Sequence, residues 1–309
     1  MPVLNIVRVL RFYTIVLRRL GIMPIGYCSK EKKYVLQTGW SFQLTHWTLQ
    51  FIYLLSMTIL AMRREAFFIV EYTSIENNYW NVLVFGALLV QFLIYAWMLM
   101  FRHFHFDIIQ HCIHLTEELS CITPRKVGVY QLIMMVAVMG ASTLNTCFMW
   151  NRLSVPNSFS ETCFHIPWLI FQMYYFILSF ILSFYICIVQ IIAGHLITVN
   201  TFIAGITLRR STRITDIYLD NIQNFLTIYD NLLLLCTENI SKSYGVIFVL
   251  ITFISTLDIT FIVYTMYTGP LEGYLQIIDS TARSVSFALP SVIFLCMMLL
   301  GSDIQAQVS

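Results

Sequence analysis

Six long apolar runs dominate the sequence, and each is bounded by charged residues, proline or polar clusters. A bilayer core about 30 Å thick is crossed by about 20 helical residues, and every run falls in or near this length. The runs are continuous, whereas a transmembrane barrel shows an alternating pattern. We therefore expect an all-α polytopic membrane protein with spans at 39–62, 79–101, 127–150, 164–193, 244–268 and 284–301.

The overall composition leads to the same class of protein. Of 309 residues, 58% are hydrophobic and 11% are charged, whereas an ordinary soluble domain has about 25% charged residues. A single globular core of this length cannot bury so much apolar surface. The principal partner of the chain is therefore expected to be the lipid bilayer.

The cationic residues between the runs predict the orientation. Of the 18 lysines and arginines, fourteen lie in the N-terminal segment and in the loops after the second and fourth runs. By the positive-inside rule, this side faces the cytoplasm and so does the N-terminus. We expect a basic cytoplasmic segment at 1–38, a transmembrane domain at 39–301 and a short cytoplasmic tail at 302–309.

The basic N-terminal segment has two interpretations. Apolar residues alternate with Arg8, Arg11, Arg18 and Arg19, which suits a helix lying on an anionic inner leaflet. The alternative is a basic flank that only orients the first span. The pattern leaves both open.

The sequence contains no motif of a known catalytic site: no phosphate-binding glycine loop, no nucleophile elbow and no zinc-protease motif. His103, Asp107, His111 and His114 share one face of a predicted helix, but they spread over three turns instead of converging on one point. We expect this face to be solvated. We expect no enzyme activity, no cofactor, no metal site and no nucleic-acid partner.

Ionisable residues and cysteines near the predicted spans give two further hypotheses. Asp258 lies near the middle of the fifth span, where an acid contacts an ion or ligand or bonds to a hydroxyl such as Thr256 or Thr260. Cys147 and Cys163 lie near the outer ends of the third and fourth spans, where the exterior permits a disulfide.

Aromatic residues gather in the outer halves of the spans. Such belts anchor helices at the lipid interface, and aromatic walls with a few polar groups also hold small organic ligands. The pocket residues that we expect are Tyr79, Trp168, Gln172, Tyr175, Tyr264 and Phe287. Such walls favour an apolar or aromatic compound over a strongly charged one.

A cytoplasmic helical segment is predicted at about 202–243. Its apolar residues recur at spacings of mostly three and four, and they are Ile214, Ile217, Ile222, Phe225, Tyr229, Leu232 and Cys236. The fourth run is long enough to project into the same layer. Two apolar-striped helices outside the membrane pack either on each other or on copies of themselves in an oligomer.

Two stretches of this chain resemble the insect gustatory receptors. They are "FYTIVLRRLGIMPIGY" before the first span and "IYDNLLLLCTENISKSYGVIFVLITF", which is similar to the helix that leads through a polar turn into the fifth span. The resemblance implies a multi-pass subunit of a ligand-gated cation channel in the plasma membrane. It also implies a homo- or hetero-tetramer built through the cytoplasmic helices, with a tastant pocket in the outer half.

The competing classes are a six-span transporter-like protein and a structural membrane protein. A transporter would show internal repeats and broken helices in matching positions, and the spans hold only Pro167 and Pro290 at such positions. The family's Thr-Tyr…Gln-Phe motif belongs to a seventh span and is missing here. We therefore expect a C-terminally shortened receptor that does not conduct alone, because the seventh span lines the ion path in the family.

The charge asymmetry predicts that an epitope tag ahead of Met1 is hidden from antibody in intact cells and is labelled after permeabilisation. A tag inserted after Thr73, in the first predicted outer loop, is expected to be labelled in both conditions. Immunofluorescence of the two tagged chains measures this, and labelling of the N-terminal tag in intact cells would overturn the orientation.

Overall fold

The computed structural model describes residues 6–28, 31, 33–36, 39–62, 74–120, 159–208 and 216–268. Within these residues the chain is helical apart from one hairpin, formed by β1 (Ile25–Cys28) and β2 (Lys33–Leu36). The helices are α1 (Ile6–Arg19), α2 (Trp40–Met62), α3 (Ser74–Met100), α4 (Arg102–Ser120), α6 (Phe159–Leu208), α7 (Asp216–Leu234), the π-helical turn η2 (Leu235–Ile240) and α8 (Ser241–Thr268).

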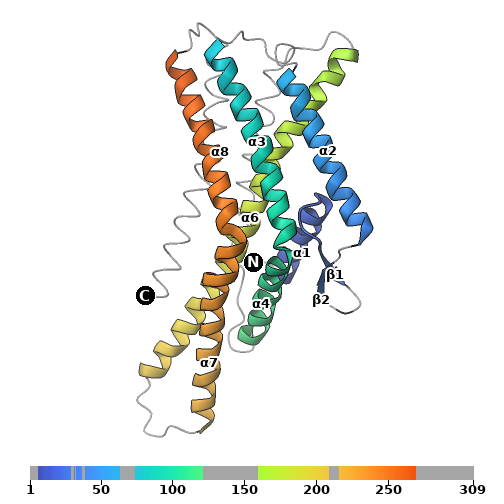
Figure 1. Ribbon diagram of the computed structural model, residues 1–309. Helices are drawn as coiled ribbons and strands as arrows, with labels where there is room; N and C mark the ends of the chain where they lie inside the picture. Colours follow the sequence, from blue (N-terminus) through green and yellow to red (C-terminus); the bar gives the residue numbers. More distant parts are fainter. Residues whose placement is uncertain are drawn as a thin grey trace.

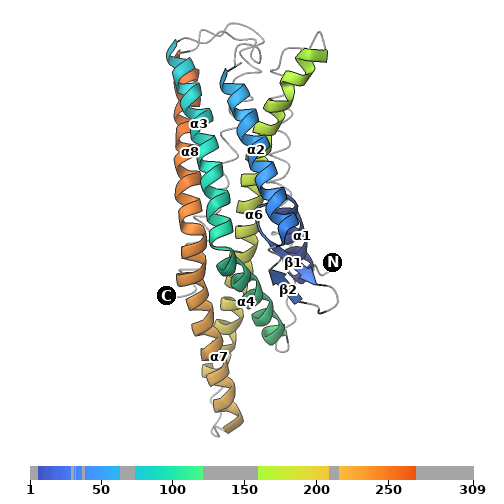
Figure 2. The ribbon, with the colours of Figure 1, turned by 45° about the vertical axis from the view of Figure 1, so that its right-hand side comes forward.

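Four of the six expected apolar helices are described, as α2, α3, α6 and α8. Their bounds contain or nearly match the runs 39–62, 79–101, 164–193 and 244–268, whereas 127–150 and 284–301 lie outside the described residues. The four helices lie side by side along their length, with contacts between α2 and α3, α2 and α6, and α3 and α8 (Figures 1 and 2). The described part is thus mainly helical, as expected, apart from the hairpin.

Helix α6 forms the core of the bundle. Phe180, Phe184 and Ile188 are at most 2% exposed. By length and apolar character, two segments among the described residues qualify as membrane spans, Phe180–Ala204 and Leu226–Ile254, and Leu88–Met100 is a shorter apolar helix. In the first of these segments, most residues are buried by the rest of the protein.

Helices α2 and α3 instead present apolar side chains outward. These exposed residues are Leu44, Trp47, Phe51, Leu54 and Leu55 on α2, and Val82, Phe85, Leu89, Phe92, Leu93 and Met100 on α3. Exposed threonine hydroxyls of the bundle bond within their own helices, because Thr45, Thr58 and Thr256 each donate to the carbonyl four residues earlier. A surface that is apolar and has its polar groups bonded internally suits lipid.

A second layer extends the bundle at one end. Helix α6 continues past Ala193 to Leu208, and α4, α7 and the start of α8 lie beside this extension (Figure 1). The predicted projection of the fourth run into a second helical layer is confirmed. The 19 residues of α7, the six of η2 and the 28 of α8 form one continuous helix, about 80 Å long.

The polar stretch before the fifth run differs from the expectation. The sequence predicted a turn there, but Glu238 lies in the π-helical turn and Ser241 begins α8 with helical backbone angles. Lys242 pairs with Glu238 at 3.3 Å across this boundary. A π-helical turn takes up one extra residue without ending the helix, so the polar residues remain helical.

The N-terminal helix is confirmed, but its apolar face is covered mainly by protein. Leu10, Tyr13 and Leu17 are almost fully buried, and the Tyr13 hydroxyl hydrogen-bonds to the Ser183 hydroxyl on α6. Phe12 remains 46% exposed at the side. Helix α1 is therefore a packed element of the fold, which neither interpretation of the basic segment had foreseen.

The helix ends in a left-handed turn at Gly21, which has a φ of 67°. The Ile22 amide donates to the Leu17 carbonyl at 2.9 Å, and the Gly21 amide donates to the Arg18 carbonyl at 3.0 Å. This is the Schellman arrangement, in which glycine takes the left-handed position and an apolar pair closes the turn. Leu17 and Ile22 are both fully buried.

The hairpin that follows was not predicted from the sequence. Its register pairs Ile25 with Leu36 and Cys28 with Lys33. The Arg11 guanidinium lies 4.9 Å from the centre of the Tyr27 ring, and the Gln110 amide donates to the Tyr34 carbonyl at 3.4 Å. The hairpin thus contacts both α1 and α4 (Figure 2).

Gly21→Ala is expected to destabilise the fold by at least about 1–2 kcal/mol, because a side chain disfavours the left-handed conformation by that amount. The added Cβ would also lie 3.0 Å from the His46 Cα. Gly39→Ala is the matched control, since its Cβ would have no neighbour within 4 Å. Thermal unfolding of the purified variants measures the difference, and equal stability would contradict the role of the turn.

Candidate functional site

The residues predicted to line an outward pocket come from three helices whose ends gather at one end of the bundle. Tyr79 lies near the start of α3, Tyr264 near the end of α8, and Trp168, Gln172 and Tyr175 in the first part of α6. These helix ends lie at the end of the bundle opposite the second layer, where the start of α6 diverges from α3 and α8 (Figures 1 and 2). Their side chains and Phe287 lie outside the described residues, so the pocket stays a prediction.

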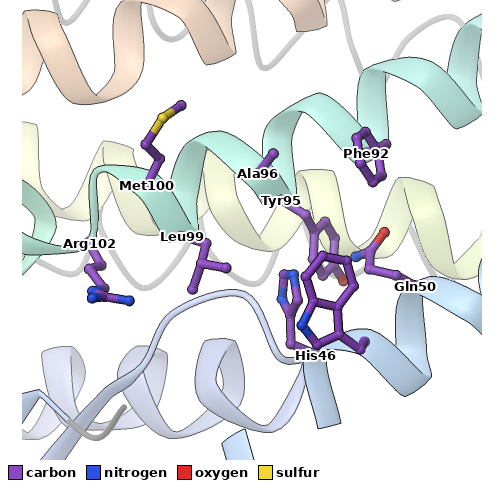
Figure 3. Close-up of a pocket in the computed structure, with 9 residues that line it drawn as sticks. His46, Gln50, Phe92, Tyr95, Ala96, Leu99, Met100 and Arg102 are labelled. Carbon is purple, nitrogen blue, oxygen red and sulfur yellow. The ribbon is translucent and has the colours of Figure 1, made fainter. Parts of the chain in front are cut away.

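A partly open pocket of about 370 Å³ lies elsewhere, between α2 and α3 near the second layer. It is lined by His46, Trp47 and Gln50 from α2, by Phe92, Tyr95, Ala96, Leu99 and Met100 from α3, and by Arg102 from the start of α4. Arg102 lies at one end, while Gln50 and Phe92 lie at the other (Figure 3). This size is typical of small-molecule sites.

The turn after α1 holds the centre of this pocket in place. The His46 Nδ1 lies 2.6 Å from the Gly21 carbonyl oxygen. Since a carbonyl only accepts, Nδ1 carries the proton. The Tyr95 hydroxyl donates to the neighbouring Leu20 carbonyl at 3.3 Å, and the centres of the His46 and Tyr95 rings are 5.7 Å apart. The backbone turn at Leu20 and Gly21 therefore fixes His46 on the α2 wall of the pocket and Tyr95 on the α3 wall.

The polar face predicted on α4 is confirmed as an exposed surface. His103, Asp107, His111 and His114 are all exposed, and Ile108 and Cys112 on other faces of the helix are fully buried. The His111 ring also bonds to the Asp107 carbonyl oxygen at 2.8 Å. Among the described residues, no group of three or more His, Cys, Asp or Glu side chains has the arrangement of a metal site.

The remaining predicted residues fall mostly on undescribed side chains. Asp258 lies in α8 and Cys163 in α6, with their side chains outside the described part, and Cys147 lies wholly outside it. The hydroxyls of Thr256 and Thr260, proposed as partners of Asp258, donate to the carbonyls of Thr252 and Thr256. A carboxylate at 258 would have to compete with these bonds.

The predicted oligomerisation stripe is described only in its last part. Leu232 is fully buried and Tyr229 is partly buried within the chain. Ile214 lies outside the described residues, and the side chains of Ile217, Ile222, Phe225 and Cys236 are not described. Since α7 contacts α6 and η2, part of this stripe packs within one chain.

The family model described as 7tm chemosensory receptor matches residues 10–307, almost the whole chain. The chain belongs to the 7tm chemosensory receptor family. No curated protein matches it. The family and the apolar helices together make this receptor a membrane protein.

The receptor also contains a buried polar cluster where α4 meets α8. The His105 ring lies edge-on to the Tyr244 ring, with their centres 5.0 Å apart. Both His105 nitrogens, the Tyr244 hydroxyl and the Ser243 hydroxyl have no hydrogen-bond partner among the described residues. Burial alone lowers the pKa of His105 from 6.5 to about 3, because the charged ring loses its hydration.

Sequence reasoning missed Gln50, Tyr95, Arg102 and His105. The signal that was available is the rarity of polar side chains within apolar runs, since such residues are usually functional. Their convergence depends on how α2, α3 and α4 pack, and no local pattern contains that information.

The receptor is expected to lose stability in acid through His105. Its folded pKa of about 3 lies below the ordinary 6.5, so its stabilising contribution is complete above pH 6.5 and falls as the pH drops from 6.5 towards 3. At pH 5 the loss is roughly 2 kcal/mol.

Thermal unfolding of the purified receptor between pH 7.5 and pH 5 tests this. His105→Phe keeps the ring and removes the titrating group, so its stability should depend less on pH by about that amount. His103→Phe is the matched control, because His103 is exposed on the same helix. An unchanged pH dependence in His105→Phe would contradict the burial argument.

Proposed function

We propose that this receptor is a subunit of a gustatory-type, ligand-gated cation channel in the plasma membrane, of the kind found in insects. The observation that carries the proposal is the family match over residues 10–307. Helices at four of the six expected spans support it. In this proposal a tastant binds each subunit from outside, and the signal passes along the helices to a shared ion path.

The proposed orientation is multi-pass, with the N-terminus and the second helical layer in the cytoplasm. The apolar segment Leu226–Ile254 includes residues that we had expected in the cytoplasm. Asp230, Glu238 and Lys242 within it are all exposed, and three exposed charges are costly in hydrocarbon. We therefore place the start of the fifth span near Tyr244, as the apolar run predicts.

The proposed oligomer, a homo- or hetero-tetramer with related receptors, uses the outer side of the second layer. The inner side of α7 is occupied within the chain, since Ile228 and Leu232 are buried. Leu226 and Leu234 on the same helix are 51% and 54% exposed. Apolar residues outside the membrane need a cover, and a neighbouring subunit supplies one in this proposal.

The proposed tastant is apolar or aromatic and binds among Tyr79, Trp168, Gln172, Tyr175, Tyr264 and Phe287. Tyr79, Trp168, Gln172, Tyr175 and Tyr264 belong to helices whose ends lie at the same end of the bundle, which supports a common site. Asp258, which precedes Tyr264 in α8, is proposed either to reach the ion path or to bond within its own helix. A disulfide between Cys147 and Cys163 would fix the same outer end.

Whole-cell recording tests the proposal. The chain is expressed as it stands and joined to a seventh span from a family member, and a panel of apolar and aromatic compounds is applied. We expect a ligand-evoked cation current from the extended chain and none from the chain alone, because the six mainly apolar spans predicted from the sequence offer no wet path for an ion.

Trp168→Ala in the extended chain is expected to raise the half-maximal ligand concentration about tenfold, as loss of an aromatic contact implies. Phe51→Ala is the matched control, since Phe51 is 65% exposed on α2 and lies outside both pockets. Absence of any evoked current from the extended, surface-expressed chain would refute the channel function. Robust current from the unextended chain would show that the pore lies elsewhere.

A further inference from the structure

The pocket between α2 and α3 has hydrogen-bond donors at its two ends and apolar walls between them. Arg102 lies at the end beside the second layer, and Gln50 lies at the far end with Phe92 (Figure 3). Phe92 on α3 and Arg102 at the start of α4 are ten positions apart in the chain, which corresponds to about 15 Å along a helix. An elongated ligand would span both donors.

Gln50 is a buried amide with unused hydrogen-bonding capacity. The side chain is 9% exposed and lines the pocket. Its Nε2 has no hydrogen-bond partner among the described residues. A buried donor without a partner costs free energy. A ligand acceptor that bonds to Gln50 would therefore contribute more binding free energy than the same bond at an exposed surface.

Arg102 supplies a positive charge at the other end. None of the carboxylates among the described residues pairs with it, although Lys33 and Lys242 each have an acidic partner. A guanidinium without a carboxylate partner among the described residues favours an anion.

The rim of the pocket opens towards the apolar surface of the bundle. Trp47 and Phe92 line the pocket and remain 59% and 50% exposed. Leu99 and Ala96 add further apolar wall. A ligand with an apolar body can therefore enter sideways from the lipid, with its charged end at the membrane boundary.

We propose that this pocket binds a single-chain amphiphilic carboxylate with an oxygen acceptor near its distal end, such as a hydroxylated fatty acid. The carboxylate pairs with Arg102, the chain lies against Tyr95 and Leu99, and the distal oxygen accepts from the Gln50 Nε2. The site is distinct from the proposed tastant pocket, which lies at the opposite end of the bundle. Through the His46 and Tyr95 bonds to the turn after α1, its occupancy is linked to the N-terminal elements.

This inference rests on the membrane orientation in the proposed function, but its test does not require a channel current. The receptor is placed in phosphatidylcholine nanodiscs at neutral pH, and saturable binding of three probes is measured above the background of empty nanodiscs. The probes are 12-hydroxydodecanoate, dodecanoate, which lacks the distal oxygen, and dodecane-1,12-diol, which lacks the charge.

We expect 12-hydroxydodecanoate to bind at one site per chain, about tenfold more tightly than either other probe. Gln50→Leu is expected to remove the preference over dodecanoate and to keep the preference over the diol. Arg102→Gln is expected to do the reverse. Arg8→Gln, which removes an exposed charge that does not line the pocket, should match the unmodified receptor.

Several outcomes would overturn the inference. They are no saturable binding, equal affinity for the three probes, unchanged preferences in both pocket variants, or displacement of the probe by an anionic phospholipid with no dependence on Gln50. Leu99→Trp fills the pocket without changing charge, so it should abolish binding while the receptor elutes normally on gel filtration. If the polar variants do not fold, this variant and the probe comparison on the unmodified receptor decide the matter.

Discussion

The left-handed turn at Gly21 is the constraint on which the end of this receptor beside the second layer depends. It ends α1, and in the same few residues it presents the Leu20 and Gly21 carbonyls to Tyr95 and His46. Because glycine has no side chain, the turn can approach the backbone of α2 closely. The N-terminal helix, the hairpin, α2 and α3 are thus joined through one turn, and the pocket walls take their positions from it.

The bundle divides its helices between two environments. Helix α6 is covered by protein over residues 180–196, whereas α2 and α3 carry apolar side chains that face outward. Because α6 is covered by protein, its polar side chains can hydrogen-bond to neighbouring elements, as Ser183 does to Tyr13 on α1. On the outward helix α2, the hydroxyls of Thr45, Ser56 and Thr58 instead donate to carbonyls of their own helix, which is the arrangement that lipid requires.

The continuous helix from α7 to α8 connects the two layers of the receptor. The π-helical turn η2 lies at the junction, next to the buried His105, Ser243 and Tyr244. Trp97 on α3 donates to the Ser243 carbonyl at 2.9 Å, so the same junction is bonded to the bundle. The helix runs through this junction without a break, so it can transmit a movement between the two layers.

The sequence alone determined the helical class, the positions of four described apolar helices, the extension of α6 and the exposed polar face on α4. These follow from run length and helical periodicity, which are local properties of the chain. The hairpin, the burial of α1 and the π-helical turn were decided by packing, because each depends on contacts such as Gln110 with Tyr34 that join distant segments. The same holds for the pocket: Gln50 and Arg102 are more than fifty residues apart, and only the contact between α2 and α3 places them around one space.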